Sequence, residues 1–136
     1  MIELKRRPMP IDRNIKILIV DDQQAMRALI KQALRTLGFR RFVEAESGAE
    51  AIICVQSEPD ISLIFSDLCM KPMTGIHLLQ AIRETYGNVP FIMITASTDK
   101  VHVFQAKEKG VDHYLMKPFN VKSIRRRIEA VFNDCF

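Results

Sequence analysis

The stretch KILIVDDQQ, residues 16–24, places two neighbouring carboxylates, Asp21 and Asp22, directly after an apolar run. The run IKILIV, residues 15–20, is short, β-branched and almost wholly apolar, which is typical of a strand buried on both faces of a parallel sheet. Two adjacent anions repel each other, and each resists ionisation unless positive charge is near. Asp also favours helix N-termini, so a solvated strand end or helix start is the plain alternative. The remainder of the chain must decide between the two.

Outward from this stretch, strand patterns alternate with helix patterns. Apolar runs predict strands at residues 15–20, 41–45, 61–66, 89–94 and 113–116. Apolar residues at helical spacing, bounded by capping residues, Gly or Pro, predict helices that begin near residues 23, 47, 74, 98 and 120. Five strands alternating with five helices indicate an α/β fold: a doubly wound, five-stranded parallel sheet with helices on both faces.

The length and composition favour one soluble globular domain. The chain has 136 residues, of which 48% are hydrophobic and 26% are charged. We expect residues 1–14 to form an irregular basic N-terminal tail and residues 15–136 to form the domain. No apolar stretch approaches the roughly 18 residues that span a membrane, and the charged N-terminus lacks the apolar segment of a secretory signal. We therefore expect no membrane insertion and a cytoplasmic location.

The net charge of +4 is carried by the two ends of the chain. Residues 1–14 and residues 121–136 each hold four basic and two acidic side chains, which together account for the whole excess. The basic stretch KSIRRR, residues 122–127, has no interleaved aromatic residues. A solvated helix face explains this pattern better than a nucleic-acid site, so we expect no nucleic-acid partner.

Candidate site residues, most of them polar, follow four of the predicted strands. They are Asp21 and Asp22 after the first strand, Asp67 after the third, Thr95 and Ala96 after the fourth, and Lys117 after the fifth. Ligands of open α/β sheets bind at the edge formed by the carboxyl ends of the strands. We therefore expect three carboxylates, a hydroxyl and an ammonium to meet at one edge of the sheet.

This set of groups suits a divalent cation and phosphoryl transfer. One ammonium cannot offset three carboxylates, and hard oxygen ligands favour Mg²⁺. Asp67 could attack phosphorus to form an aspartyl phosphate, while Lys117 and the Thr95 hydroxyl each meet a phosphoryl oxygen. The sequence has no Gly-rich nucleotide-binding loop, so the phosphate would arrive on another molecule.

Four motifs together resemble one family. They are IVDD (residues 19–22), SDLCM…MTG (residues 66–75), ITA (residues 94–96) and YLMKPF (residues 114–119). In this order and spacing they resemble response-regulator receiver domains, the CheY-like family, over residues 15 to about 134. The resemblance implies the flavodoxin-like strand order 2-1-3-4-5.

The resemblance also implies residue roles. Asp67 is the phospho-acceptor; Asp67, Thr95 and Lys117 are catalytic; and Thr95, Ala96 and Lys117 bind the phosphoryl group. The implied protein ligands of Mg²⁺ are Asp22 directly, Asp21 through water, Asp67, and the backbone carbonyl of Cys69. Thr95 and Tyr114 are the implied switch residues. The Lys117–Pro118 bond is expected to be cis.

The implied function is that of a stand-alone response regulator. It takes its phosphate from a histidine kinase or phosphotransfer protein and signals to a downstream protein effector through the face of the fourth helix, fifth strand and fifth helix. It catalyses its own phosphorylation and dephosphorylation and is otherwise not an enzyme. We expect a monomer or weak dimer.

Two alternatives and three departures from the family pattern accompany this interpretation. A phosphohydrolase of the haloacid dehalogenase kind would carry a second acid two residues after its nucleophile, where this chain has Cys69. A vestigial receiver could instead serve as a binding module. Lys71 precedes Pro72 where the family usually has Pro directly after Met, and Cys69 and Ser97 occupy positions that flank the path of hydrolysis. The last two predict a long-lived phosphoryl group.

Overall fold

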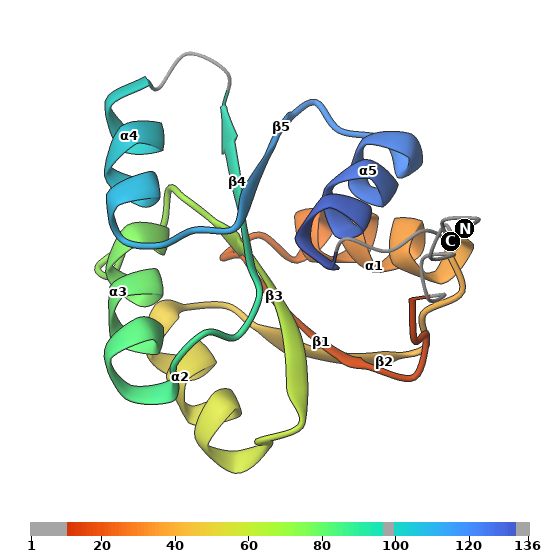
Figure 1. Cartoon of the computed structure of the whole chain (residues 1–136), viewed down its shortest axis with the longest axis horizontal. Helices are drawn as coiled ribbons and strands as arrows, with labels where there is room; N and C mark the ends of the chain where they lie inside the picture. The colour runs from red at the N-terminus through yellow and green to blue at the C-terminus, as the bar shows by residue number, and fades with distance from the viewer. Residues whose placement is uncertain (1–10, 97–99, 133–136) are drawn as a thin grey trace, which may run out of the picture.

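Five parallel strands form the central layer of the computed structural model, which describes residues 11–96 and 100–132 (Figure 1). The strands are β1 (Lys16–Val20), β2 (Arg41–Ala45), β3 (Ile61–Asp67), β4 (Phe91–Ala96) and β5 (His113–Lys117). The helices are α1 (Gln24–Thr36), α2 (Gly48–Ser57), α3 (Gly75–Tyr86), α4 (Lys100–Glu108) and α5 (Val121–Phe132). The strand order is β2-β1-β3-β4-β5, which confirms the predicted fold class and the order implied by the resemblance.

The alternation of β1 explains the two helix layers. Ile17 and Ile19 belong to the core under α1 and α5, whereas Leu18 and Val20 belong to the core under α2 and α3. Figure 1 shows these layers on opposite sides of the sheet. All four side chains are fully buried, and each contributes about 1.5–3 kcal/mol to the free energy of folding.

Among the helices of the described residues, none combines the length and the apolar character that a membrane span requires.

Side-chain caps fix the starts of two helices. The Ser47 hydroxyl accepts a hydrogen bond from the Glu50 backbone N–H (3.1 Å), so α2 begins where the sequence predicted. Thr74 caps α3 by accepting from the His77 backbone N–H (3.2 Å), and His77 Nδ1 accepts from the Thr74 N–H in return. Such caps contribute about 1 kcal/mol each. The second cap holds α3 directly behind the end of β3.

Three strands reach further than the sequence predicted. Asp67, Thr95, Ala96 and Lys117 were expected to follow their strands, and this detail was wrong, because all four continue the sheet pairing. Asp67 pairs with Ile94, Thr95 with Met116, and Ala96 with Lys117. Strand positions hold side chains more rigidly than loop positions, so these residues are fixed by the sheet itself.

The N-terminal lead-in joins the domain at residue 11. Ile11 is buried with the core under α1 and α5, and Arg13 Nε donates to the Leu37 carbonyl (3.0 Å) at the end of α1. Residues 1–10, which make up most of the predicted basic tail, lie outside the described residues, as do Ser97 and Thr98. The tail therefore stays a prediction.

Candidate functional site

Three carboxylates gather at the carboxyl edge of the sheet. Asp21 and Asp22 directly follow β1, and Asp67 ends the neighbouring strand β3. Each offers an oxygen that lies within 4.8 Å of the oxygens of the other two. Asp21 and Asp67 are 1% and 5% exposed, whereas Asp22 is exposed to solvent. The cluster therefore opens to solvent on the side of Asp22.

A lysine from the outermost strand, β5, reaches this cluster. Lys117 ends β5, two strands away from β3, and its Nζ donates to Asp67 Oδ1 (3.3 Å). The lysine side chain is partly exposed, whereas that of Asp67 is buried. A partly exposed ion pair of this length is weak, so the ammonium can move toward another oxygen at little cost.

Asp21 has a raised pKa. Burial raises the pKa of Asp21 to about 6; the Gln23 N–H and Lys117 oppose this rise, while the charges of Asp67 and Asp22 add to it. Its Oδ1 accepts from the Gln23 N–H (2.8 Å), but the buried Oδ2 has no hydrogen-bond partner in the described part of the chain. A buried carboxylate oxygen without a partner is costly unless a cation or proton meets it.

The loop between β3 and α3 is anchored around Asp67. Leu68 and Met70 are buried, while Cys69 between them is exposed. Gly75 begins α3 so close to β3 that a Cβ there would overlap the Asp67 carbonyl oxygen. Only glycine permits this approach, which explains why the MTG motif accompanies the acidic residue. The start of α3 thus packs directly against the backbone of Asp67.

Thr95 and Tyr114 border a common cavity. The cavity has a volume of about 340 Å³ and lies between α4 and the ends of β4 and β5. The buried Thr95 donates through Oγ1 to the Ala96 carbonyl (3.2 Å). Tyr114 is half-buried, and within the described residues its buried hydroxyl has no hydrogen-bond partner. Empty space therefore connects the two side chains that the resemblance assigns to a switch.

The comparison with protein families decides the identity of the fold. Residues 17–129 match the model of the response regulator receiver domain. The chain belongs to the receiver domain family. This result decides against the haloacid dehalogenase alternative, and it agrees with the resemblance in the four motifs.

Relatives of this receiver are chemotaxis regulators. It is 38% identical over 120 residues to the chemotaxis protein CheY of Pseudomonas aeruginosa, covering 87% of this chain and 96% of that protein. It is 36% identical over 124 residues to the chemotaxis protein CheY-3 of Vibrio cholerae, covering 90% and 95%. A solved CheX–CheY–BeF3–Mg²⁺ complex from Borrelia burgdorferi matches with a TM-score of 0.82 at 30% identity, covering 87% and 89%. The receiver is homologous to CheY response regulators of two-component systems.

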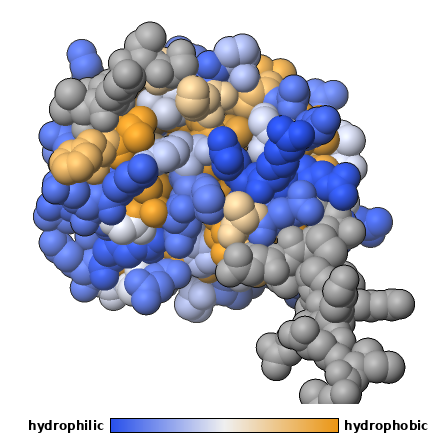
Figure 2. All heavy atoms as spheres, turned by 45° about the horizontal axis from the view of Figure 1, so that its top comes forward, coloured by the Kyte–Doolittle hydropathy of each residue, from blue (hydrophilic) through white to orange (hydrophobic). Residues whose placement is uncertain are grey.

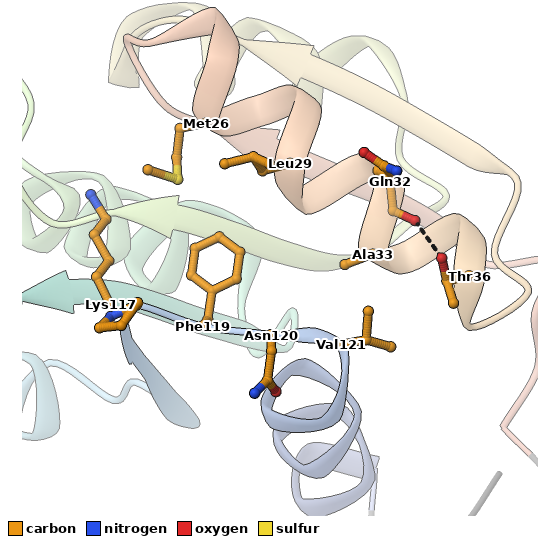
Figure 3. Close-up of a pocket in the computed structure, with 10 residues that line it drawn as sticks. Met26, Leu29, Gln32, Ala33, Thr36, Lys117, Phe119, Asn120 and Val121 are labelled. Carbon is orange, nitrogen blue, oxygen red and sulfur yellow. Dashed lines mark hydrogen bonds between the residues drawn. The ribbon is translucent and has the colours of Figure 1, made fainter.

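An apolar groove runs beside the carboxyl edge of the sheet. Figure 3 shows Met26, Leu29 and Ala33 of α1 facing Phe119 and Val121, which lie just before and at the start of α5. The groove has a volume of about 640 Å³, and Lys117 stands at one end of it. Leu29 is 55% exposed. The groove and the carboxylate cluster thus share Lys117.

Some features of the site were not predicted from the sequence. The Lys117–Pro118 bond is cis, as the resemblance implied, but so is the Lys71–Pro72 bond. Arg27 of α1 donates to the Asp21 carbonyl and pairs with Glu44, although neither residue was predicted to take part. No sequence pattern predicts that Arg27 and Glu44 meet, because their contact depends on how α1 packs against β2.

Proposed function

We propose that this receiver accepts a phosphoryl group on Asp67 from a histidine kinase or phosphotransfer protein, in a reaction that depends on Mg²⁺. The observation that carries the proposal is the cluster of three carboxylate oxygens within 4.8 Å, with Lys117 touching one of them. Such an excess of negative charge at a sheet edge is unstable by itself. It becomes favourable when a cation and a phosphoryl group share the site.

The residues present fit a magnesium ion. The three carboxylates supply hard oxygen ligands, and the partnerless Asp21 Oδ2 is a buried acceptor that such an ion, or a water bound to it, would satisfy. Asp22, Asp67 and the Cys69 backbone carbonyl would hold the ion, with Asp21 acting through water. When bound, Mg²⁺ would neutralise charge on the phosphoryl oxygens and so lower the barrier to attack by an anion.

The protein groups then have defined tasks in the transfer. An Asp67 carboxylate oxygen forms a bond to phosphorus as the phosphorus–nitrogen bond of the donor phosphohistidine breaks, and the imidazole leaves with the electron pair and takes up a proton. Lys117 moves from Asp67 Oδ1 to a phosphoryl oxygen. The Thr95 hydroxyl and the Ala96 backbone N–H would donate to the others.

The signal would leave through the face of α4, β5 and α5. When Thr95 turns toward the phosphoryl group, it leaves space in the cavity that it borders with Tyr114, and the tyrosine ring can move further in. The phosphoryl group can only favour a conformation that the protein already visits. Phe104 and Met116 on this side are 61% and 48% exposed. Figure 2, which brings the top of Figure 1 forward, shows hydrophobic patches on an otherwise hydrophilic face.

The phosphoryl donor would dock on the groove beside α1. Lys117 lines this groove and also contacts Asp67, so a protein seated there delivers its phosphohistidine directly to the carboxylate cluster. The exposed Leu29 offers apolar surface for such a partner. Small phosphodonors need no such surface, which separates docking from chemistry in an experiment.

We further propose that the receiver acts on no other substrate, works in the cytoplasm, and is a monomer or weak dimer. The carboxylate cluster is small and lacks a nucleotide-binding loop, which supports self-phosphorylation over turnover of a free metabolite. The relatives named CheY extend over nearly the same length as this chain, which is compatible with output through a separate protein effector.

The test is covalent labelling by acetyl phosphate with Mg²⁺, followed by intact mass spectrometry. We expect one phosphoryl group per chain, no label in Asp67→Ala, and little label in EDTA. Asp60→Ala, at the opposite edge of the sheet, is the matched control and should label like the wild type. Absence of label in the folded wild type would support the vestigial alternative, and label that survives Asp67→Ala would refute the assignment of the acceptor.

A further inference from the structure

The Asp21–Asp22 segment is held by a contact from outside the carboxylate cluster. Arg27 Nη1 donates to the Asp21 carbonyl oxygen at 2.7 Å. This oxygen belongs to the peptide unit that joins Asp21 to Asp22, and a peptide unit is planar. Holding the carbonyl therefore fixes the direction in which the chain presents both carboxylates.

The same guanidinium is anchored on the neighbouring strand. Arg27 Nε donates to Glu44 Oε1 on β2 (3.1 Å), and Lys31, one turn further along α1, donates to Glu44 Oε2 (2.7 Å). The hydrogen bond from Lys31 lowers the pKa of Glu44, burial raises it, and the hydrogen bond from Arg27 lowers it again. The net result is a pKa below the ordinary value. Glu44 is followed by Ala45, whose carbonyl accepts from the Asp21 N–H (3.1 Å). These hydrogen bonds thus connect α1, β2 and the end of β1.

Arg27 forms an ion pair with Glu44 and donates a second hydrogen bond to a backbone carbonyl. Within the described residues, its hydrogen bonds go to Glu44 and to a peptide group, and none goes to a carboxylate of the cluster. Its side chain is only 12% exposed. It can thus organise the cluster without competing with a divalent ion for the carboxylate oxygens.

We propose that Arg27 is a positioning residue for the cation site, acting through the Asp21 carbonyl. The inference rests on the proposed Mg²⁺ dependence. Magnesium requires near-ideal octahedral geometry and tolerates displaced ligands poorly. Loss of a group that orients metal ligands typically costs 10–100-fold in metal affinity. Lys31 touches the same glutamate but not Asp21, so it provides the matched control.

The experiment measures Mg²⁺ binding by calorimetry in the full-length wild type, Arg27→Met and Lys31→Met, and urea unfolding of each in EDTA. Both substitutions remove one ion pair with Glu44, and both should lower stability. We expect Arg27→Met to weaken Mg²⁺ binding by about 10-fold and Lys31→Met to change it by less than about twofold. A folded Arg27→Met protein that binds Mg²⁺ like the wild type would overturn the inference, as would an equal loss in Lys31→Met.

Arg27→Lys keeps the charge and guards against misfolding of the methionine variant. One ammonium cannot reproduce the fork that reaches both the Asp21 carbonyl and Glu44, so Mg²⁺ affinity should again fall. Wild-type affinity in folded Arg27→Lys would contradict a positioning role that needs the guanidinium. If the wild type itself binds no Mg²⁺, the proposed function fails on its metal, which is a different result from wild-type binding that survives Arg27 substitution.

Discussion

The two edges of the sheet treat charge in opposite ways. At the amino edge, Lys16 Nζ lies between Glu58 Oε1 (2.9 Å) and Asp60 Oδ1 (3.0 Å), and Arg41 pairs with Asp60 as well (2.7 Å). Two cations face two anions there. At the carboxyl edge, three carboxylates share a single described ion pair, between Lys117 and Asp67. The first arrangement favours the folded state, whereas the second leaves negative charge that, under the proposed function, a cation would offset.

The pKa shifts follow the same division. Hydrogen bonds from Lys16 and Arg41 lower the pKa of Asp60, which means that the folded state favours its anion. Burial raises the pKa of Asp21 to about 6, which means that the folded state disfavours its anion. The charged form of Asp21 is therefore destabilising near neutral pH in the absence of a ligand. We infer that this destabilisation is retained because it is relieved by binding.

The largest effect should be the difference in labelling rate between Lys117→Met and Lys16→Met. Lys117→Met removes a donor that meets the transferred phosphoryl group, and such losses slow reactions by about 100-fold or more. Lys16→Met removes two ion pairs at the opposite edge and should leave the labelling rate within about twofold of the wild type. Time courses with acetyl phosphate, on variants shown to be folded by circular dichroism, measure both rates. Equal rates for the two variants would break the comparison between the edges.

The next effect is on stability. The folded pKa of Asp21 is raised, so the wild type loses stability as pH increases from about 3.8 to about 6. Asp21→Asn escapes this loss and should be more stable than the wild type by on the order of 2 kcal/mol at pH 7.5, with the gain vanishing below about pH 4.

Asp60→Asn should show the opposite sign. The folded pKa of Asp60 is lowered, so its contribution is present above the ordinary pKa and is lost as pH falls. This variant should be slightly less stable than the wild type at pH 7.5. Urea unfolding in EDTA across this pH range measures both variants, and a stability gain in Asp21→Asn that does not depend on pH would refute the electrostatic explanation.

A smaller effect should separate docking from chemistry. Leu29→Asp places a charge in the groove beside α1 and should slow transfer from a phosphorylated kinase by about 10-fold, since burying the exposed half of a leucine contributes roughly 1 to 1.5 kcal/mol. Ile53→Asp alters a similarly exposed residue on α2 and should have little effect. Both variants should react normally with acetyl phosphate. Slower labelling of Leu29→Asp by the small donor would show damage to the cluster itself.

The smallest effect concerns the lifetime of the phosphoryl group. The exposed Cys69 offers a weak S–H donor beside the acceptor, so it should orient an attacking water poorly. Cys69→Asn supplies an amide and should speed decay several-fold, on the order of the contribution of one positioned hydrogen bond. Cys69→Ala should decay like the wild type. Unchanged decay in the asparagine variant would show that another group sets the lifetime.

The sequence predicted most of the fold because local patterns and the global sheet agree. The apolar run of β1 and the Thr74 and Gly75 start of α3 each carry a signal within a few residues. The strand order came from the resemblance, since periodicity says nothing about which strands are neighbours. The ends of β3, β4 and β5 were misplaced because Asp67, Thr95 and Lys117 interrupt the apolar runs, whereas sheet pairing depends on the backbone.

The carboxylates and the lysine could be predicted for a related reason. Each directly follows or ends a strand, and the carboxyl ends of parallel strands meet at one edge. Arg27 and Glu44 had no such rule, because their contact arises from the packing of a helix on a strand. The raised pKa of Asp21 also needed the structure, because it depends mainly on burial.

The most direct test of the account follows backbone amide chemical shifts by NMR as Mg²⁺ and then beryllofluoride are added. We predict large shifts at residues 20–23, 66–70 and 94–96 and along β5, and little change at residues 58–62 of the amino edge. Asp67→Ala should keep a weakened response to Mg²⁺ and lose the response to beryllofluoride. Shifts that are absent at the carboxyl edge, or that persist with beryllofluoride in Asp67→Ala, would contradict the claim that this edge is built to receive a cation and a phosphoryl group.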